Sequence, residues 1–402
     1  MARVCAALAF LVPGAGSALG APLPSGADPL DVHNLRECAY PEGLPRWARD
    51  RSDEELVLGL RTMREARPDQ FGPTAGLPPG SRLVPDTATM AELLLVYPSW
   101  EDHDETYATL LRHASRHGTV RVVPLVESAV LPLQRVLASS GADPARVTVD
   151  PSYPLDSIWV RDWGPLPFAG PNGRGWLDAR YSPDCFFNDG WPSRTVTAQP
   201  GRRVVRTSLF IDGGNLVVDK TGRCYTTTPM AEHNGLGTEA VAAALVREAG
   251  CVEVVVLEPL VGNVIDHVDM LLSPAPDGSL LLAAFDPAED PDNAAVMARN
   301  RARLLATPQA GGVVPVLREI RSPATGWSLD GPVVRTWVNL LPFNGIVFVP
   351  AYADADPERQ AEALRRIRAA YPGREVVLVP SDALIRQGGG VHCIARGLPV
   401  GG

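Results

Sequence analysis

The chain has 402 residues, of which 45% are hydrophobic and 21% charged, and its formal net charge is −9 at pH 7. This composition is typical of a globular protein with a large core and excludes an intrinsically disordered chain. The acidic balance disfavours a nucleic-acid partner but does not oppose a cationic substrate. Beyond residue 20, no apolar run approaches the roughly 18 residues of a membrane span, so we expect no membrane partner. The sequence leaves the oligomeric state open.

Residues 1–20 have the layout of a secretory signal peptide. Arg3 supplies the charged start, an apolar run follows over residues 4–13, and small residues precede a plausible cleavage site after Gly20. A buried N-terminal strand is the alternative, which the proline-rich sequence after Gly20 disfavours. We therefore predict a secreted or periplasmic protein, with an N-terminal extension over residues 21–85, one helix near 52–66, and the main domain over 86–402.

Export would leave an odd number of cysteines in the mature chain: Cys38, Cys185, Cys224, Cys251 and Cys393. In an oxidising compartment at least one of these thiols stays free or pairs between chains. The sequence does not determine how the others pair. A functional free cysteine is the simplest explanation of the odd count.

A unit of helix, strand and hairpin recurs along the main domain. The predicted helices begin at a capping residue or a proline, and two of them end at a glycine. They cover residues 104–117, 238–249, 290–307 and 356–372, and the apolar strands that follow them cover 120–124, 251–257, 313–317 and 376–380. A further helix is expected over 128–140 with a strand over 147–150, and hairpins over 216–226 and 270–284. This order predicts an α/β fold with a closed, pseudosymmetric arrangement.

Polar residues cluster where these units meet. Such clusters lie over residues 156–165, 212–215, 262–269, 337–339 and 390–393. Five junctions that each supply polar groups predict one functional site on a central axis.

The last of these clusters contains a candidate nucleophile. Three glycines, Gly388 to Gly390, precede Val391, His392 and Cys393. Glycines permit positive φ angles and close backbone approach, so we expect the thiol of Cys393 to be presented to solvent. A structural or disulfide-bonded cysteine is an equal alternative on this segment alone. His392 is expected to point to the other side of the strand and is interpreted as structural.

Two other clusters carry the remaining candidates. His267 and Asp269 are two residues apart, so alternation in a strand would place them on one face, as a base and a carboxylate serving one substrate require. One histidine without a nearby cysteine disfavours structural zinc. Asp162 beside Arg161 is in isolation better explained as a surface ion pair. Trp159 fits either the core or a ring near a cationic ligand.

The motifs Trp-x-Arg-Asp-x-Gly-Pro, Gly-Gly-Asn, His-x-Asp and Gly-Gly-Gly-x-His-Cys together resemble the agmatine deiminase and bacterial peptidyl-arginine deiminase family of guanidine-modifying enzymes, over about residues 85–400. The resemblance implies a five-bladed α/β propeller of the pentein type and catalysis without a metal or organic cofactor. It also implies Cys393 as nucleophile, His267 as acid and base, and Asp162 and Asp269 as ligands of the guanidinium. Further residues expected at the substrate site are Trp159, Asn215, Asn339, Gly389 and Gly390.

The expected chemistry suits these residue types. A guanidinium is planar, permanently charged and complementary to carboxylates, so two aspartates would hold its carbon against a thiolate. Attack would give a tetrahedral adduct, His267 would protonate the departing ammonia, and water would release the ureido product from a covalent thiouronium.

The motifs indicate the exact substrate less clearly than they indicate the chemistry. Agmatine-specific members of the family usually have glycine before the catalytic histidine, whereas this chain has Asp266, which resembles the exported peptidyl-arginine branch. However, the segment over 181–189 lacks the arginines expected to bind a peptide carboxylate. The favoured prediction is deimination of arginine or peptidyl-arginine to citrulline, and the alternative is agmatine deimination to N-carbamoylputrescine.

Two other protein classes are weaker alternatives. Cys393, His267 and Asn339 match the residue types of a cysteine protease or transglutaminase triad. Such a site has no use for Asp162 and Asp269 in its pocket. An inactive binding protein is disfavoured because all the expected polar groups are present.

Overall fold

The computed structural model of the chain describes residues 75–98, 101–150, 155, 157–181, 189, 203–263, 265–308, 312–328 and 331–399. The expected signal peptide, the helix near 52–66, Cys38 and Cys185 lie outside these residues. The division at residue 85 therefore stays a prediction. The last residues of the expected extension are described: β1 (Arg82–Leu83) pairs antiparallel with β5 (Leu166–Gly170).

The long helices follow local signals in the sequence. They are α3 (Asp104–His117), α4 (Val130–Ser140), α8 (Thr238–Glu248), α9 (Pro291–Ala306) and α10 (Pro357–Ala370), as predicted to within a few residues. Asp290 caps α9 by accepting a hydrogen bond from the Asn293 amide, and Asp356 caps α10 through the Arg359 amide. A proline begins each of these two helices, where its missing N–H is not needed. The short helices α5 (Val160–Trp163), α7 (Pro229–His233) and α11 (Asp382–Arg386) were not predicted.

Five of the described sheets share one pattern, in which an antiparallel pair of strands is extended by a parallel neighbour. The strands, listed sheet by sheet, are β1, β5, β6 (Gly173–Arg180) and β7 (Arg203–Phe210); β8 (Val217–Val218), β9 (Arg223–Thr227) and β10 (Glu253–Leu257); β11 (Leu272–Pro274), β12 (Leu280–Ala284) and β13 (Leu317–Arg321); β16 (Leu341–Phe343), β17 (Ile346–Ala351) and β18 (Glu375–Pro380); and β19 (Ala395–Pro399), β2 (Met90–Tyr97), β3 (Thr119–Pro124) and β4 (Val147–Val149). A sixth sheet consists of β14 (Gly326–Ser328) and β15 (Gly331–Val333).

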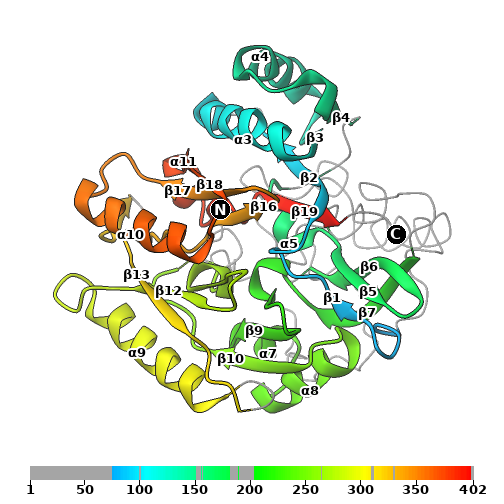
Figure 1. Cartoon of the computed structure of the whole chain (residues 1–402), viewed down its shortest axis with the longest axis vertical. Coiled ribbons are helices and arrows are strands. Elements are labelled where there is room, and N and C mark those ends of the chain that lie inside the picture. The colour runs from blue at the N-terminus through cyan, green and yellow to red at the C-terminus, as the bar shows by residue number, and fades with distance from the viewer. Residues whose placement is uncertain are drawn as a thin grey trace, which may run out of the picture.

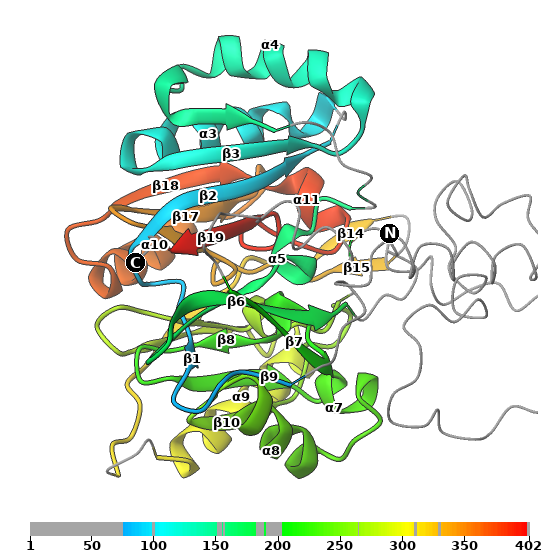
Figure 2. The same cartoon turned by 90° about the vertical axis from the view of Figure 1, so that its right-hand side faces the viewer.

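The sheets lie toward the middle of the molecule and the long helices lie outside them (Figure 1). The C-terminal strand β19 pairs antiparallel with β2, the second strand of the described chain (Figures 1 and 2). Apolar residues of β2 and β3 pack with α3 in one core cluster that also contains Cys393. The turn that carries this cysteine is therefore part of the folded core.

The α/β class is confirmed, but the predicted closed propeller is not. Each sheet in the described ranges is open and has two to four strands, and none closes on itself. The strand predicted over 313–317 is wrong, since β13 begins at Leu317. Val313, Val314 and Val316 are more than half exposed, so this apolar run does not mark a buried strand. The β5–β6 hairpin was missed, although the Pro171-Asn172-Gly173 sequence at its turn is a turn signal.

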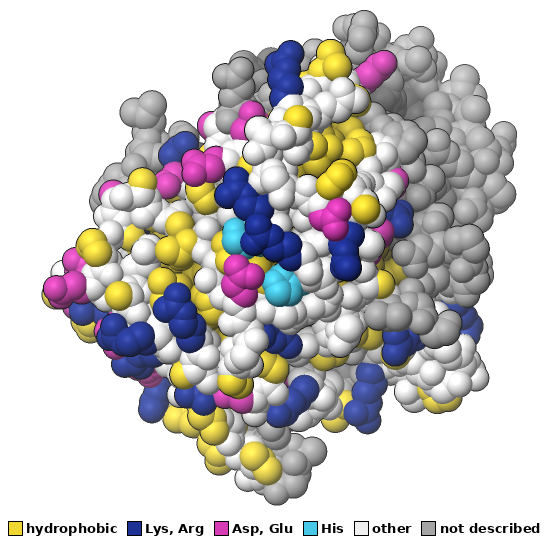
Figure 3. All heavy atoms as spheres, turned by 45° about the horizontal axis from the view of Figure 1, so that its top comes forward, with side chains coloured by type: hydrophobic (Ala, Val, Ile, Leu, Met, Phe, Trp, Pro, Cys, Tyr) yellow, Lys and Arg dark blue, Asp and Glu magenta, His cyan; other side chains and the backbone are white. Residues whose placement is uncertain are grey.

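Charges of both signs lie next to one another on the face that Figure 3 shows. His113 and His117 on α3 both contact Glu375 at the start of β18, at 3.0 and 3.2 Å. Within the described ranges, no helix combines the length and the apolar character that a bilayer span requires.

Candidate active site

The turn that carries Cys393 follows β18 and α11. Gly388 adopts a φ of 97°, a conformation that side chains disfavour. Gly389 has a different role: a Cβ atom there would lie 2.5 Å from the Trp159 ring and 3.1 Å from Cys393 Cβ. The Trp159 ring therefore packs against this turn. The expected presentation of the thiol to solvent is wrong, because Cys393 is fully buried.

Three polar groups surround the thiol. Asn339 Nδ2 lies 3.3 Å and the Gly390 amide nitrogen 3.4 Å from Cys393 Sγ, and Asp269 Oδ2 lies 3.7 Å from it. Burial raises the pKa of Cys393 well above its usual value, and the charges of Asp269 and Asp162 add to this effect. Without a bound ligand, the sulfur is therefore a thiol that faces two hydrogen-bond donors.

The imidazole of His267 lies between two carboxylates. Its Nδ1 is 3.3 Å from Asp162 Oδ1 and its Nε2 is 3.3 Å from Asp212 Oδ2. Burial alone would lower the pKa of His267, but Asp162 and Asp212 outweigh it and raise that pKa well above the usual value. The ring is therefore positively charged at neutral pH. Asp212 was not among the predicted site residues, although it directly precedes the Gly-Gly-Asn motif.

Three predicted site residues converge on Gly214. The Gly214 amide donates to Asp162 Oδ1 at 3.0 Å. A Cβ atom on Gly214 would collide with that oxygen and would lie 2.9 Å from His267 Nδ1 and 3.1 Å from Asp269 Oδ2. Asp162, His267 and Asp269 are thus brought together as predicted. The predicted strand is wrong, because Asp269 lies in a 3₁₀ helix (Val268–Met270) that begins directly after His267.

The two carboxylate oxygens of Asp269 differ in their hydrogen bonding. Oδ2 accepts a hydrogen bond from His392 Nδ1 at 2.8 Å, whereas Oδ1 is buried and has no hydrogen-bond partner among the described residues. His392 therefore does not point away from the site, as had been expected. An unpaired buried carboxylate oxygen is costly, so this atom marks a place for a donor from a ligand.

The interpretation of Arg161 and Asp162 as a surface ion pair is also wrong. Both side chains are buried. Arg161 Nη1 contacts Asp86 Oδ1 at 2.7 Å, and Arg161 Nε donates to the His392 carbonyl at 3.2 Å. The Arg161 amide also donates to the Cys393 carbonyl, at 3.1 Å. Arg161 thus joins the segment that carries Asp162 to the turn that carries Cys393.

Asn215 and Asn339 hold neighbouring backbone in place. Asn215 Oδ1 accepts from the Thr227 amide and hydroxyl at 3.1 and 2.8 Å and from the Val268 amide at 3.1 Å. Asn215 therefore fixes the turn between His267 and Asp269, and none of its recorded contacts is to the thiol. Asn339 Oδ1 accepts from the His392 amide at 3.1 Å, while its Nδ2 faces the sulfur.

Two of the remaining cysteines form a disulfide. Cys224 of β9 is bonded to Cys251, which lies just before the parallel neighbour β10. Cys393 is the free cysteine among the residues that the structure describes. In the same ranges, no group of three or more potential ligand side chains is arranged to hold a metal ion. The expectation of catalysis without a metal stays a prediction.

Comparisons with known proteins agree with this geometry. The chain is 26% identical over 368 residues to the agmatine deiminase of Stutzerimonas stutzeri, a match that covers 80% of this chain and 96% of the relative. The fold is similar to solved agmatine deiminases of Enterococcus faecalis (TM-score 0.69, 19% identity, 80% of this chain and 96% of that one) and C. jejuni (TM-score 0.66, 17% identity, 80% and 96%). The family described as Porphyromonas-type peptidyl-arginine deiminase matches residues 82–399. The chain belongs to this family.

Proposed function

We propose that the protein hydrolyses a guanidinium group to a ureido group and ammonia. One arrangement carries the proposal: a free thiol lies 3.7 Å from a buried aspartate that has an unpaired oxygen, and a second buried aspartate contacts the histidine beside it. Two buried carboxylates next to a thiol favour a cation as ligand. The same charges would repel the oxyanion of a protease or transglutaminase intermediate.

In this proposal, substrate binding activates the nucleophile. Burial raises the pKa of Asp162 in spite of its contact with the charged His267, so a further positive charge beside this carboxylate would be stabilised. A guanidinium that binds between Asp162 and Asp269 supplies that charge. It offsets the negative charges that help to keep the pKa of Cys393 high, and the thiol then releases its proton to solvent more readily.

The chemical steps follow from the positions of the groups. The thiolate of Cys393 attacks the guanidinium carbon to give a tetrahedral adduct, and the charged imidazole of His267 donates a proton to the departing ammonia. The C–N bond breaks and a thiouronium remains on Cys393. His267, now neutral, takes a proton from water that attacks the same carbon. The ureido product leaves as the C–S bond breaks, and the sulfur regains a proton.

We propose arginine or peptidyl-arginine as the substrate, and agmatine as the alternative. The family match and Asp266 support the first choice, and the similarity to agmatine deiminases supports the second. Asp266 has a φ of 54°, in the left-handed region that glycine adopts without strain. The glycine at this position in agmatine-specific members is thus explained by the backbone conformation. Asp266 is therefore a weaker indicator of the substrate than the family match.

We also propose that the protein is exported and that its units surround one axis as five blades. The layout of residues 1–20 and the Cys224–Cys251 disulfide support export, because disulfides persist in oxidising compartments. The shared strand pattern of five sheets and the pairing of the C-terminal strand β19 with β2 support the five units.

Release of ammonia from arginine, an arginine-containing peptide and agmatine, measured side by side on the purified protein, tests the function. We expect turnover of arginine or the peptide with a kcat/KM at least about tenfold above that of agmatine, because a pocket with partners for the α-substituents leaves them unpaired with agmatine. A higher value for agmatine would make the alternative correct. No turnover of any of the three would refute deimination.

A further inference from the structure

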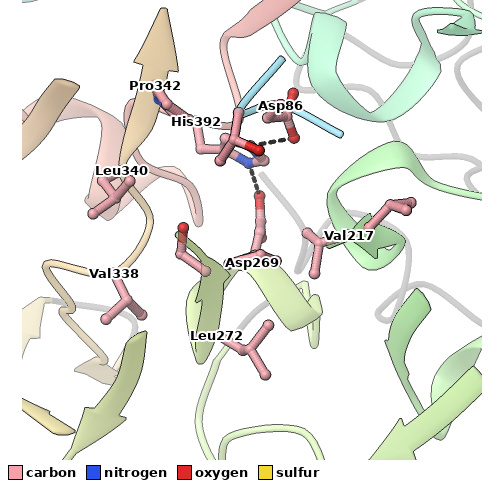
Figure 4. A pocket seen from close by; sticks show the side chains of 12 residues that line it. Asp86, Val217, Asp269, Leu272, Val338, Leu340, Pro342 and His392 are labelled. Atoms are coloured by element: carbon pink, nitrogen blue, oxygen red, sulfur yellow. Dashed lines mark hydrogen bonds and ion pairs between the residues drawn. The ribbon is translucent and has the colours of Figure 1, made fainter. Parts of the chain in front are cut away.

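Three ionisable side chains, those of Asp269, His392 and Asp86, form a hydrogen-bonded series next to the proposed nucleophile. His392 Nδ1 lies 2.8 Å from Asp269 Oδ2, and His392 Nε2 lies 3.3 Å from Asp86 Oδ2 (Figure 4). Asp269 and His392 are buried, whereas the side chain of Asp86 is 27% exposed. This hydrogen-bonded series therefore extends from the interior of the site to a partly exposed carboxylate.

We propose that His392 is a positioning residue for deimination: its contact with Asp269 Oδ2 fixes that carboxylate so that Oδ1 is presented to the guanidinium. This inference rests on the proposed function, in which Asp269 is a ligand of the substrate. His392 itself touches neither the substrate nor the reacting atoms in this proposal.

A small cavity adjoins the Asp269 carboxylate. It is lined by Asp86, Asp269 and His392, by Thr87 and Ser273, for which no hydrogen bond to Asp269 is recorded, and by apolar side chains that include Val338 and Leu340 (Figure 4). These apolar side chains offer no hydrogen-bond donor to the carboxylate. His392 provides the direct side-chain hydrogen bond recorded for Asp269, and Cys393 Sγ shares the same oxygen at 3.7 Å.

The ring of His392 is itself held from several sides. Asp86 faces its Nε2, and Arg161 holds Asp86 through a 2.7 Å contact while also bonding the His392 carbonyl. Burial would raise the pKa of Asp86, but Arg161 and His392 outweigh it and hold that pKa well below its usual range. Asp86 is therefore a carboxylate at neutral pH, and each ring nitrogen of His392 faces an aspartate oxygen. The guanidinium of Arg396 donates a hydrogen bond to the Arg161 carbonyl and adds a second arginine next to Arg161.

Two amide substitutions separate positioning from packing. The amide nitrogen of asparagine can occupy the position of the histidine Nδ1, whereas that of glutamine reaches the position of Nε2. We therefore expect His392→Asn to keep kcat/KM within about tenfold of the wild type. For His392→Gln and His392→Ala we expect kcat/KM at least about tenfold below that of the Asn variant, because residues that hydrogen-bond to metal ligands from outside cause losses of about this size when they are replaced. If His392 only fills space, the larger glutamine should be the better replacement.

The control is His103→Gln. His103 is also buried, and its Nδ1 also lies 2.8 Å from an aspartate oxygen, that of Asp102, in the segment that leads into α3. We expect this variant to keep wild-type kcat/KM. All rates are normalised to the folded fraction, measured by circular dichroism.

Asp269→Asn, assayed in parallel, distinguishes a failure of the positioning role of His392 from a failure of the proposed function. If it is inactive and the Gln variant of His392 equals or exceeds the Asn variant, the positioning role is wrong and the proposed function stands. If Asp269→Asn keeps near wild-type activity, the proposed role of Asp269 in binding the guanidinium fails first, and the positioning role fails with it.

Discussion

The Nδ1 atom of His267 lies 3.3 Å from Oδ1 of Asp162, so the proposed acid contacts one of the proposed guanidinium ligands before any substrate is present. Asp162 and Asp269 both lie next to Gly214, where any side chain would collide with the site. An incoming guanidinium must therefore share Asp162 with the charged imidazole. The acid and the substrate cation would be placed side by side by the same carboxylate.

The first prediction concerns the state of the thiol. Because burial and two aspartates raise the pKa of Cys393, we expect iodoacetamide to alkylate it more slowly near neutral pH than it alkylates a cysteine in a short peptide. Chloroacetamidine carries the charge of a guanidinium, and should react with Cys393 at least about tenfold faster than iodoacetamide. Mass spectrometry of the labelled peptides measures both rates.

Cys393→Ser should be folded and without activity. Cys224 and Cys251 provide an internal control, because the disulfide protects them from both reagents in the absence of a reductant. Labelling at another cysteine, or an active serine variant, would show that Cys393 is not the nucleophile.

The second prediction concerns the two carboxylates. Asp162→Asn and Asp269→Asn keep the side-chain size and remove the charge, and each should lower kcat/KM on the order of a hundredfold or more, because a charge-assisted bond to a desolvated cation is lost. Asp178→Asn is a matched control, since Asp178 is equally buried but pairs with Arg206. It should change stability and leave kcat/KM of the folded protein near the wild-type value. Near wild-type activity of either site variant would remove that residue from the guanidinium site.

The third prediction tests why His267 is charged. Asp212 stabilises the imidazolium, so Asp212→Asn should lower the pKa of His267, and the ring should lose its proton at a lower pH than in the wild type. NMR titration of the labelled histidine Cε1 resonances measures this pKa, and His267→Gln identifies the resonance. An unchanged or higher pKa in the Asn variant would contradict the contribution of Asp212.

The fourth prediction concerns stability. The Cys224–Cys251 disulfide joins residues 27 positions apart. In the chain-entropy estimate, a closed loop of this size stabilises the fold by about 3 to 4 kcal/mol. We expect the double variant Cys224→Ala, Cys251→Ala to lose about this free energy of unfolding in urea denaturation, and reduction of the wild type to have the same effect. Equal stability of reduced and oxidised protein would count against a structural role for this disulfide.

The fifth prediction concerns Asp266. Its left-handed backbone costs an L-residue about 1–2 kcal/mol, a cost that glycine avoids, although glycine also loses more entropy on folding. Asp266→Gly should therefore leave the thermal midpoint close to that of the wild type, whereas Asp266→Ala should lower it. Both variants should keep deimination activity, because Asp266 is expected not to touch the guanidinium. A loss of activity as large as that of Asp269→Asn would place Asp266 in the site.

The sequence by itself determined the features that depend on short segments. Asp290-Pro291 and Asp356-Pro357 locate the starts of two helices, because a capping carboxylate and a proline act within one turn. The short motifs also predicted Cys393, His267, Asp162 and Asp269 as site residues, because each of these polar groups lies within one of the short motifs.

Only the tertiary structure decided which groups meet and how they are charged. His392 and Asp86 are 306 positions apart, and no local pattern relates them. Asp212 became part of the site because the end of β7 lies beside the turn that carries His267. The same holds for the burial of Cys393 and for the Cys224–Cys251 pairing. Burial and pairing are set by chain segments distant in sequence, and they fix the electrostatic environment of each group, which residue type alone cannot specify.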